Sequence, residues 1–238
     1  MTQLAEIRRW FWASTLSGHF GGWNTKQMGA DTVAVRSWAE GKTSEIDAGL
    51  TFPTSTIWRA KGFRSNSAVA KMMALMLAAR KPVDLKNGQV IDTDKSLAWN
   101  NDKEFHHFFP QAYLKHVKKL SANESGLVAN IVMLTSASNV AIRDKAPSDY
   151  LQEIIDADGR AVLVDRLGKS LISEEALDAA LADDYEAFLS LRSQLLHEIA
   201  KALVSIPGTA APQEVESLSD EIEDSDASDD DTPDSDVS

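Results

Sequence analysis

The chain contains no cysteine, so disulfide bonds and thiolate metal sites are both excluded. It also lacks any apolar run near the ~20 residues that a membrane-spanning helix needs. The first residues, M-T-Q-L-A-E-I-R-R-W, do not have the order of a signal peptide, in which charge precedes an apolar stretch and a small-residue cleavage site. We therefore expect a cytoplasmic protein with no membrane contact.

Basic residues are missing from one end of the chain. Residues 213–238 contain twelve acids and no Lys or Arg; subtracting them from the 36 Asp and Glu residues leaves 24 acids against 24 bases. The net charge of −12 therefore belongs to this segment, and 208–238 has the composition of a disordered acidic tail. Two interpretations stay open. The tail only aids solubility, or it mimics DNA and occupies a basic cleft until a partner or substrate displaces it.

Apolar residues at helical spacing fill much of the remaining chain, which is long enough for one or two domains. Helices are predicted over 2–17, 25–40 and 66–80, and the region 160–205 is predicted to be helical, with its last helix packed on the N-terminal helices. The tryptophans and the methionine cluster of 66–80 fit a core better than a base-stacking set or a partner groove. The residues expected to face inward from the first two helices are Leu4, Ile7, Trp10 or Phe11, Leu16, Met28, Val33, Val35 and Trp38.

Residues 104–150 contain the candidate chemistry. A His pair, His106 and His107, is followed by Pro110, by a short helix over 111–120 and by an apolar strand from Gly126 to about 134. A further helix is predicted over roughly 137–143, and another begins at Pro147. Neighbouring side chains on an extended segment point to opposite faces, so the two histidines must have different roles.

Phosphodiester hydrolysis explains these residue types. It needs a base for water, which an imidazole can be near neutral pH, and a cation on the phosphate. We assign His107 as the base and His106 with Asn139 as the metal ligands. Asn130 would either orient His107 or hold the loop. Arg143, four residues after Asn139 on the same helix face, would grip the phosphate, with Lys145 as a weaker candidate.

Two segments of this region resemble the HxxP-bearing HNH domain of GmrSD-type, modification-dependent restriction proteins: H-H-F-F-P and A-N-I-V-M-L-T-S-A-S-N-V-A-I-R-D-K. They are also similar to the HNH domain of the RNA-guided nuclease of type II CRISPR systems. The resemblance implies that the family's base falls on His107, its bracing Asn on Asn130, and its metal ligands on His106 and Asn139. Many relatives have an N-terminal nucleotide-binding sensor domain that is not found in this sequence, so the chain resembles the effector half alone.

These observations together predict a mainly α protein with an embedded ββα-metal (HNH) motif, in which helices lie on both sides of a short two-stranded hairpin. The expected regions are helical 1–97, a nuclease core over 98–150, helical 151–207 and the tail. The predicted function is a Mg²⁺-, Mn²⁺- or Ni²⁺-dependent DNA endonuclease in antiviral defence, with a separate sensor or NTPase subunit as partner. A non-catalytic DNA- or partner-binding module is the alternative, and RNA is a possible substrate. Candidate nucleic-acid contacts are Arg59, Lys61, Arg64, Lys115, Lys118, Lys119 and Lys145.

Overall fold

A computed structural model describes residues 3–19, 24–47, 50–64, 67–93, 105–205 and 214–215. It is mainly helical, with two small two-stranded sheets, β1–β4 and β2–β3. No helix among the described residues has both the length and the apolar content needed to cross a bilayer. The elements are α1 (Gln3–Leu16), α2 (Thr25–Ala39), β1 (Phe52–Pro53), α3 (Ile57–Ala60), α4 (Ala68–Ala79), β2 (Phe105–His107), α6 (Gln111–Tyr113), the π-helix η2 (Leu114–Lys118), α7 (Ala122–Ser125), the 3₁₀ helix η3 (Val128–Asn130), β3 (Ile131–Met133), α8 (Ser136–Ile142), α9 (Pro147–Asp158), α10 (Arg160–Lys169), α11 (Glu174–Leu181), α12 (Tyr185–Val204) and β4 (Glu214–Val215).

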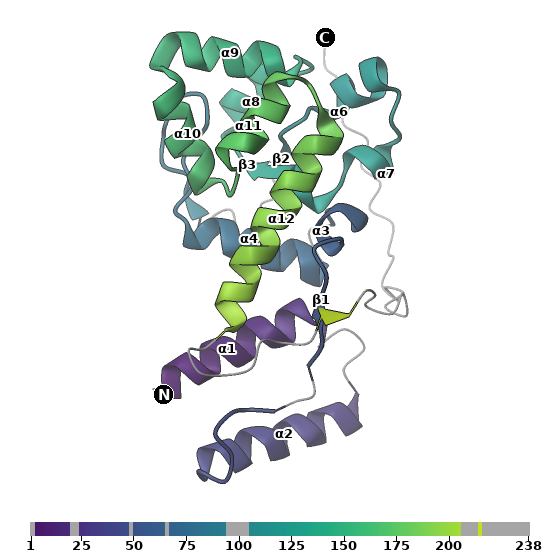
Figure 1. The fold of residues 1–238 in the computed structure, drawn as a ribbon, viewed down its shortest axis with the longest axis vertical. Coiled ribbons are helices and arrows are strands. Elements are labelled where there is room, and N and C mark those ends of the chain that lie inside the picture. Colours follow the sequence, from purple (N-terminus) through teal and green to yellow (C-terminus); the bar gives the residue numbers. More distant parts are fainter. Residues whose placement is uncertain are drawn as a thin grey trace.

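The longest helix, α12, runs through the middle of the molecule (Figure 1). Its N-terminal half packs against α11 (Figure 1). It also contacts α1 and α3, so the predicted packing of this helix on the N-terminal helices is confirmed. One continuous apolar core joins residues from Leu16 to Val204, so the predicted N-terminal, central and C-terminal regions share it. The prediction that the methionines of 66–80 are core is confirmed, because Met72, Met73 and Met76 are buried.

Most helix ends follow the capping signals of the sequence. Asn24 begins α2 with a capping box to Gln27, and Gly41 has a φ of +73° just after the helix. Ser67 caps α4 and Ser173 caps α11 through hydrogen bonds from backbone amides. These side chains accept bonds from amides that have no partner inside the helix, which fixes where each helix begins.

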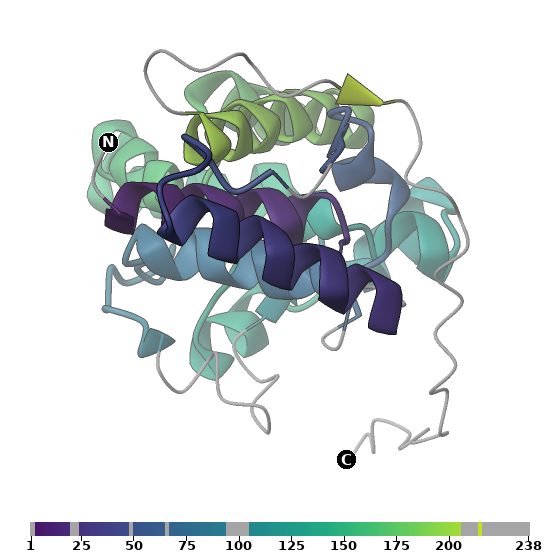
Figure 2. The ribbon, with the colours of Figure 1, turned by 90° about the horizontal axis from the view of Figure 1, so that it is seen from below.

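The predicted inner faces of α1 and α2 are wrong at most positions, although Leu16 is buried as expected. Leu4, Ile7 and Phe11 are exposed, whereas α1 buries Glu6, Ser14 and Leu16. Apolar residues occur almost all round this helix, so their spacing did not select one face. In α2, Met28 and Val33 are exposed and the buried residue is Asp31, whose carboxylate is 2.8 Å from Nε2 of His19. From below, α2 crosses in front of α1 (Figure 2).

The predicted tail differs from expectation at two residues. Glu214 and Val215 form β4, which pairs in parallel with β1 in the register Phe52↔Glu214 and Pro53↔Val215. Residues 208–213 and 216–238 of that prediction lie outside the described residues.

Candidate functional site

The His pair lies in β2, which is antiparallel to β3. His106 pairs with Val132 and His107 with Ile131. β3 begins at Ile131, five residues later than the predicted start at Gly126, and Val128, Ala129 and Asn130 form a 3₁₀ turn instead of an extended segment. Both histidines are half-buried. The small sheet and the helix α8 that follows it give the order strand, strand, helix.

Two phenylalanines anchor the chain directly after the His pair. The Phe108 ring stacks on Phe188 of α12, with centroids 4.7 Å apart and planes 4° apart, and meets Tyr150 edge-on. The Phe109 ring packs on Tyr185 and Phe188, each with a centroid separation of 5.1 Å. Because both rings are buried, the end of β2 is held against α12 while the histidines remain on the strand.

Asn130 holds the loop and does not bond to His107. Its Oδ1 accepts a hydrogen bond from the Phe109 amide at 2.8 Å, and its Nδ2 donates to the carbonyls of Phe109 and Ser125 at 3.0 and 2.9 Å. The side chain is fully buried and cannot reach water, so these three bonds satisfy polar groups that would otherwise have no hydrogen-bond partner. Of the two roles predicted for Asn130, the bracing role agrees with the geometry.

A buried cation supports the same segment from α12. The Arg192 guanidinium is fully buried and donates to the carbonyls of Ala129, Ser170 and Leu171 at 2.9, 3.0 and 3.3 Å. Two of these carbonyls follow the C-terminus of α10, where the helix dipole favours positive charge. Burial lowers the pKa of Arg192 to about 9, and the nearby Tyr150 hydroxyl partly opposes that shift.

Asp84 fixes the start of α8. Its Oδ2 accepts hydrogen bonds from the amide and hydroxyl of Thr135 at 2.9 and 2.8 Å, and its Oδ1 accepts one from the Ser138 hydroxyl at 2.7 Å. Oδ1 also accepts the amides of Lys86 and Asn87, which closes the predicted Asn87-Gly88 turn. Burial alone raises the pKa of Asp84, but these bonds outweigh it and hold the pKa below its usual 3.8.

Sequence reasoning missed both Asp84 and Arg192. Each had a local signal. Asp84 comes just before the Asn87-Gly88 turn, at a spacing that lets its carboxylate accept hydrogen bonds from the backbone amides of that turn. Arg192 lies four residues from both Phe188 and Leu196, on the apolar stripe of the last helix, where a charged residue must find partners. Neither signal identifies the distant carbonyls or hydroxyls that the fold supplies.

Asn139 is half-buried in α8, whose predicted range of 137–143 agrees with the observed helix. Arg143 is exposed and lies one residue beyond α8, with φ of +51° and ψ of −116°. Its amide still donates to the Asn139 carbonyl at 2.9 Å. Because its backbone has left the helix, the same-face argument that aligned Arg143 with Asn139 was wrong.

The predicted basic contacts fall into two neighbouring groups. Lys115, Lys118 and Lys119 are exposed on and just after η2, a π-helix of a type that is rare and often found at functional sites. Arg59, Lys61 and Arg64 belong to α3 and the segment after it. That segment runs beside 126–128, since the Lys61 carbonyl accepts the Val128 amide and the Phe63 amide donates to the Gly126 carbonyl.

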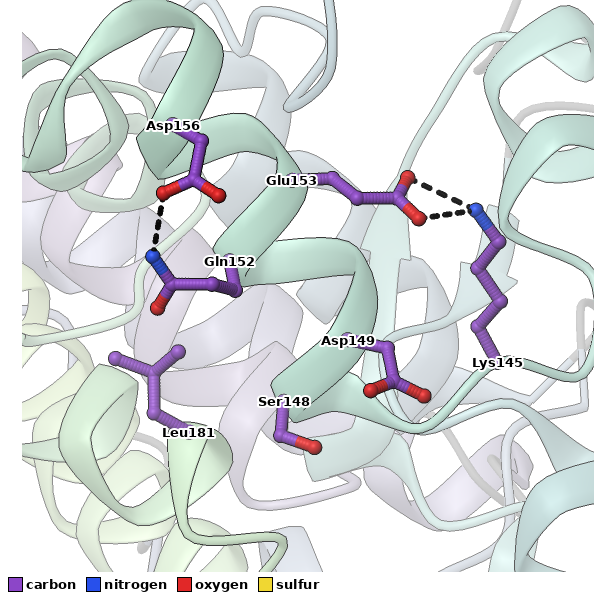
Figure 3. Close-up of a pocket in the computed structure, with 7 residues that line it drawn as sticks. All are labelled: Lys145, Ser148, Asp149, Gln152, Glu153, Asp156 and Leu181. Carbon is purple, nitrogen blue, oxygen red and sulfur yellow. Dashed lines mark hydrogen bonds and ion pairs between the residues drawn. The ribbon is translucent and has the colours of Figure 1, made fainter.

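Lys145 lies at a different place. Both Glu153 oxygens accept hydrogen bonds from its Nζ, at 2.6 and 2.8 Å, on the rim of an open pocket of about 640 Å³ (Figure 3). The pocket is lined largely by α9 and includes neither histidine of β2 nor Asn139. Its carboxylates Glu153 and Asp156 already have hydrogen-bond partners, so we do not place the candidate chemistry there.

His107 is electrically neutral at neutral pH. Burial lowers its pKa to about 4 by removing water from the imidazolium, and the charge of His106 adds a smaller effect in the same direction. A neutral imidazole has one ring nitrogen that can accept a proton.

The two predicted metal ligands, His106 and Asn139, are too few to form a closed metal site. Among the described residues, no group of three or more His, Cys, Asp or Glu side chains is placed to hold a metal. One imidazole from His106 and one amide oxygen from Asn139 leave most of a coordination sphere to water and phosphate oxygens, as magnesium sites commonly do. The chemistry of these two donors suits Mg²⁺, Mn²⁺ or Ni²⁺, and their role as metal ligands stays a prediction.

No protein-family model, no curated protein and no solved structure matches this chain. The roles of these residues therefore rest on their chemistry and geometry.

Proposed function

We propose that this protein is a divalent-metal-dependent HNH-type endonuclease that hydrolyses phosphodiester bonds in foreign or modified DNA. The observation that supports this best is the order β2, β3, α8, with adjacent histidines on the first strand and Asn139 on the helix. The antiparallel register directs His106 and His107 to opposite faces of the sheet, so one can bind a metal while the other meets water.

In this proposal, His107 accepts the proton of the attacking water. Its neutral ring is in the correct protonation state above pH 4, and the negative charge of a bound phosphate would raise its pKa toward the working pH. Asn130, Phe108 and Phe109 keep the end of β2 fixed, so the ring does not need to be ordered at the moment of reaction.

His106 and Asn139 would hold the metal ion. When bound, such an ion neutralises phosphate charge and stabilises the leaving oxygen. Arg143 and the basic residues beside β2 would contact phosphates flanking the scissile bond. Asp84 would fix the first turn of α8 and through it the backbone that bears Asn139.

Cleavage of supercoiled plasmid DNA with Mg²⁺ or Mn²⁺ tests the proposal. We expect conversion to nicked or linear plasmid that EDTA abolishes and that His107→Ala slows by roughly 10²–10⁴-fold. Both proteins should be purified identically, and their urea unfolding at pH 7 should be compared to exclude misfolding.

Two results would contradict the proposal. One is equal cleavage by wild type and His107→Ala, which would indicate a contaminating nuclease. The other is no cleavage of plasmid, of modified phage DNA, or of either with a sensor subunit added. Metal-independent DNA binding without cleavage would favour the non-catalytic binding module.

A further inference from the structure

The acidic segment 216–238 directly follows β4 in the sequence. β4 is parallel to β1, and Val215 pairs with Pro53. After Pro53 the chain reaches α3 within four residues. Val215 therefore lies beside the strand that leads into α3 and the basic segment after it; Figure 1 shows β4 as the yellow-green arrow beside β1, below α3.

A basic surface includes α3 and η2 with the residues that follow each of them. We define it as Arg59, Lys61, Arg64, Lys115, Lys118 and Lys119. The segment 61–63 runs along 126–128, which directly follows α7, and α7 contacts η2. In Figure 1 the elements α3, α7 and α6 lie along the same side of the molecule, so the segments that carry the two basic groups run along that side.

The three lysines at the η2 end of this surface are exposed to solvent. The Lys119 amine donates to the His116 carbonyl at 2.7 Å, and the Lys118 amine lies 6.0 Å from the centre of the Tyr113 ring. Within the described part of the chain, no carboxylate is ion-paired with Lys115, Lys118 or Lys119. Clustered positive charge of this kind attracts a polyanion most strongly at low salt.

We propose that residues 216–238 dock on this basic surface and compete there with nucleic acid. The segment contains eleven acids and no Lys or Arg. Its 23 residues reach roughly 75 Å when extended, more than twice the roughly 30 Å length of a 20-residue helix such as α12. Because β4 tethers it, its effective concentration at the surface is on the order of mM.

The docking itself does not depend on catalysis, whereas the competition rests on the proposed nucleic-acid binding. Two measurements separate the two ideas. The first is zero-length carbodiimide coupling of the full chain, which joins lysine amines to carboxylates in contact, read by mass spectrometry. Lys26, exposed on α2 at the other end of the molecule, is the matched control amine.

At 50 mM salt we expect residues 216–238 to couple to Lys115, Lys118 and Lys119 at least roughly fivefold more than to Lys26, and the excess to vanish at 1 M salt. Equal coupling to all exposed lysines would overturn the proposal. So would coupling that occurs only between isotopically light and heavy chains in a mixture, because the contact would then be between copies.

The second measurement compares DNA affinity. In the variant, the eleven acids of 216–238 are replaced by Asn and Gln, and β4 is left intact. We expect it to bind a 20-base-pair duplex roughly tenfold more tightly than wild type at 50 mM salt, with the difference lost at high salt. Equal affinities would overturn the competition. Selective coupling without DNA binding by either protein would keep the docking and refute the proposed function instead.

Discussion

Asp84 offers the sharpest test of how this fold holds its candidate site. The carboxylate is fully buried and joins the 84–88 turn to the first turn of α8. Replacing it with Ala would leave five donors without their acceptor. Two of them, the amides of Lys86 and Asn87, belong to the partly exposed turn and can bond to water. The other three, from Thr135 and Ser138, hold α8.

The magnitude follows from those three bonds. A hydrogen bond to a charged group contributes about 1.5 kcal/mol or more, so Asp84→Ala should lower the free energy of unfolding by about 4 kcal/mol. Asp84→Asn should cost nearly as much. Its single remaining oxygen cannot accept bonds on both sides, and its amide group would face the N–H of Thr135.

Urea unfolding at pH 7, followed by tryptophan fluorescence, measures this loss, because Trp58 is buried in the core. Asp149→Asn is the matched control, since it removes the same charge from an exposed position on α9. It should change stability by less than about 0.5 kcal/mol. Amide exchange should show α8 opening more readily in the Asp84 variants than in this control.

The pH dependence gives a second, independent check. The pKa of Asp84 is lowered in the folded state, so its stabilisation is complete above the ordinary aspartate pKa and is lost as pH falls through the folded value. The difference between wild type and Asp84→Asn should therefore shrink in acid. A loss below about 1 kcal/mol at pH 7, or a difference that grows toward pH 3, would refute this account of α8.

Three further predictions concern the segments around the candidate site, all measured by urea unfolding. Asn130→Ala should lower stability by about 3 kcal/mol, and Asn130→Asp by no less at pH 7, because a carboxylate cannot donate to the two carbonyls; a neutral effect would contradict the bracing role. Arg192→Met should also cost about 3 kcal/mol, since three buried carbonyls lose their donor, and Arg192→Lys should recover part of it. With a folded pKa of about 4, His107 binds its proton more weakly in the folded protein than in the unfolded chain. The free energy of unfolding should therefore fall by up to about 3 kcal/mol as the pH is lowered from 6.5 to 4, and His107→Ala should lack this pH dependence.

The candidate site was predictable where its chemistry is local in sequence. The His pair, the apolar segment before α8 and the capping residues of the helices all lie within a few residues of the structure they specify. Arg143 shows where local reasoning stopped. Counting four residues from Asn139 assumed that the helix continued, and the backbone turns out of α8 at that residue.

Burial was harder to predict than helicity. In α1, apolar residues point in most directions, and the buried face was decided by which neighbours cover it. Glu6 is buried because its carboxylate accepts bonds from Arg9 and the Ile46 amide, and Ile46 is forty residues away. A rule based on hydrophobicity alone places such a residue in solvent.

The sequence by itself determined the mainly helical class, the ends of α1, α2, α4 and α8 to within two residues, the order strand, strand, helix and the location of the acidic segment. These depend on residues that act on their own backbone through capping, spacing and composition. The sequence did not show that the helical region predicted over 160–205 is divided into α10, α11 and α12. Only the tertiary structure decided that Asn130 bonds to the loop and not to His107, that Asp84 and Arg192 support the candidate site, and that Glu214 and Val215 pair with β1. Those contacts join residues twenty to more than a hundred positions apart, and a polar group finds such a partner only after the apolar core has closed around it.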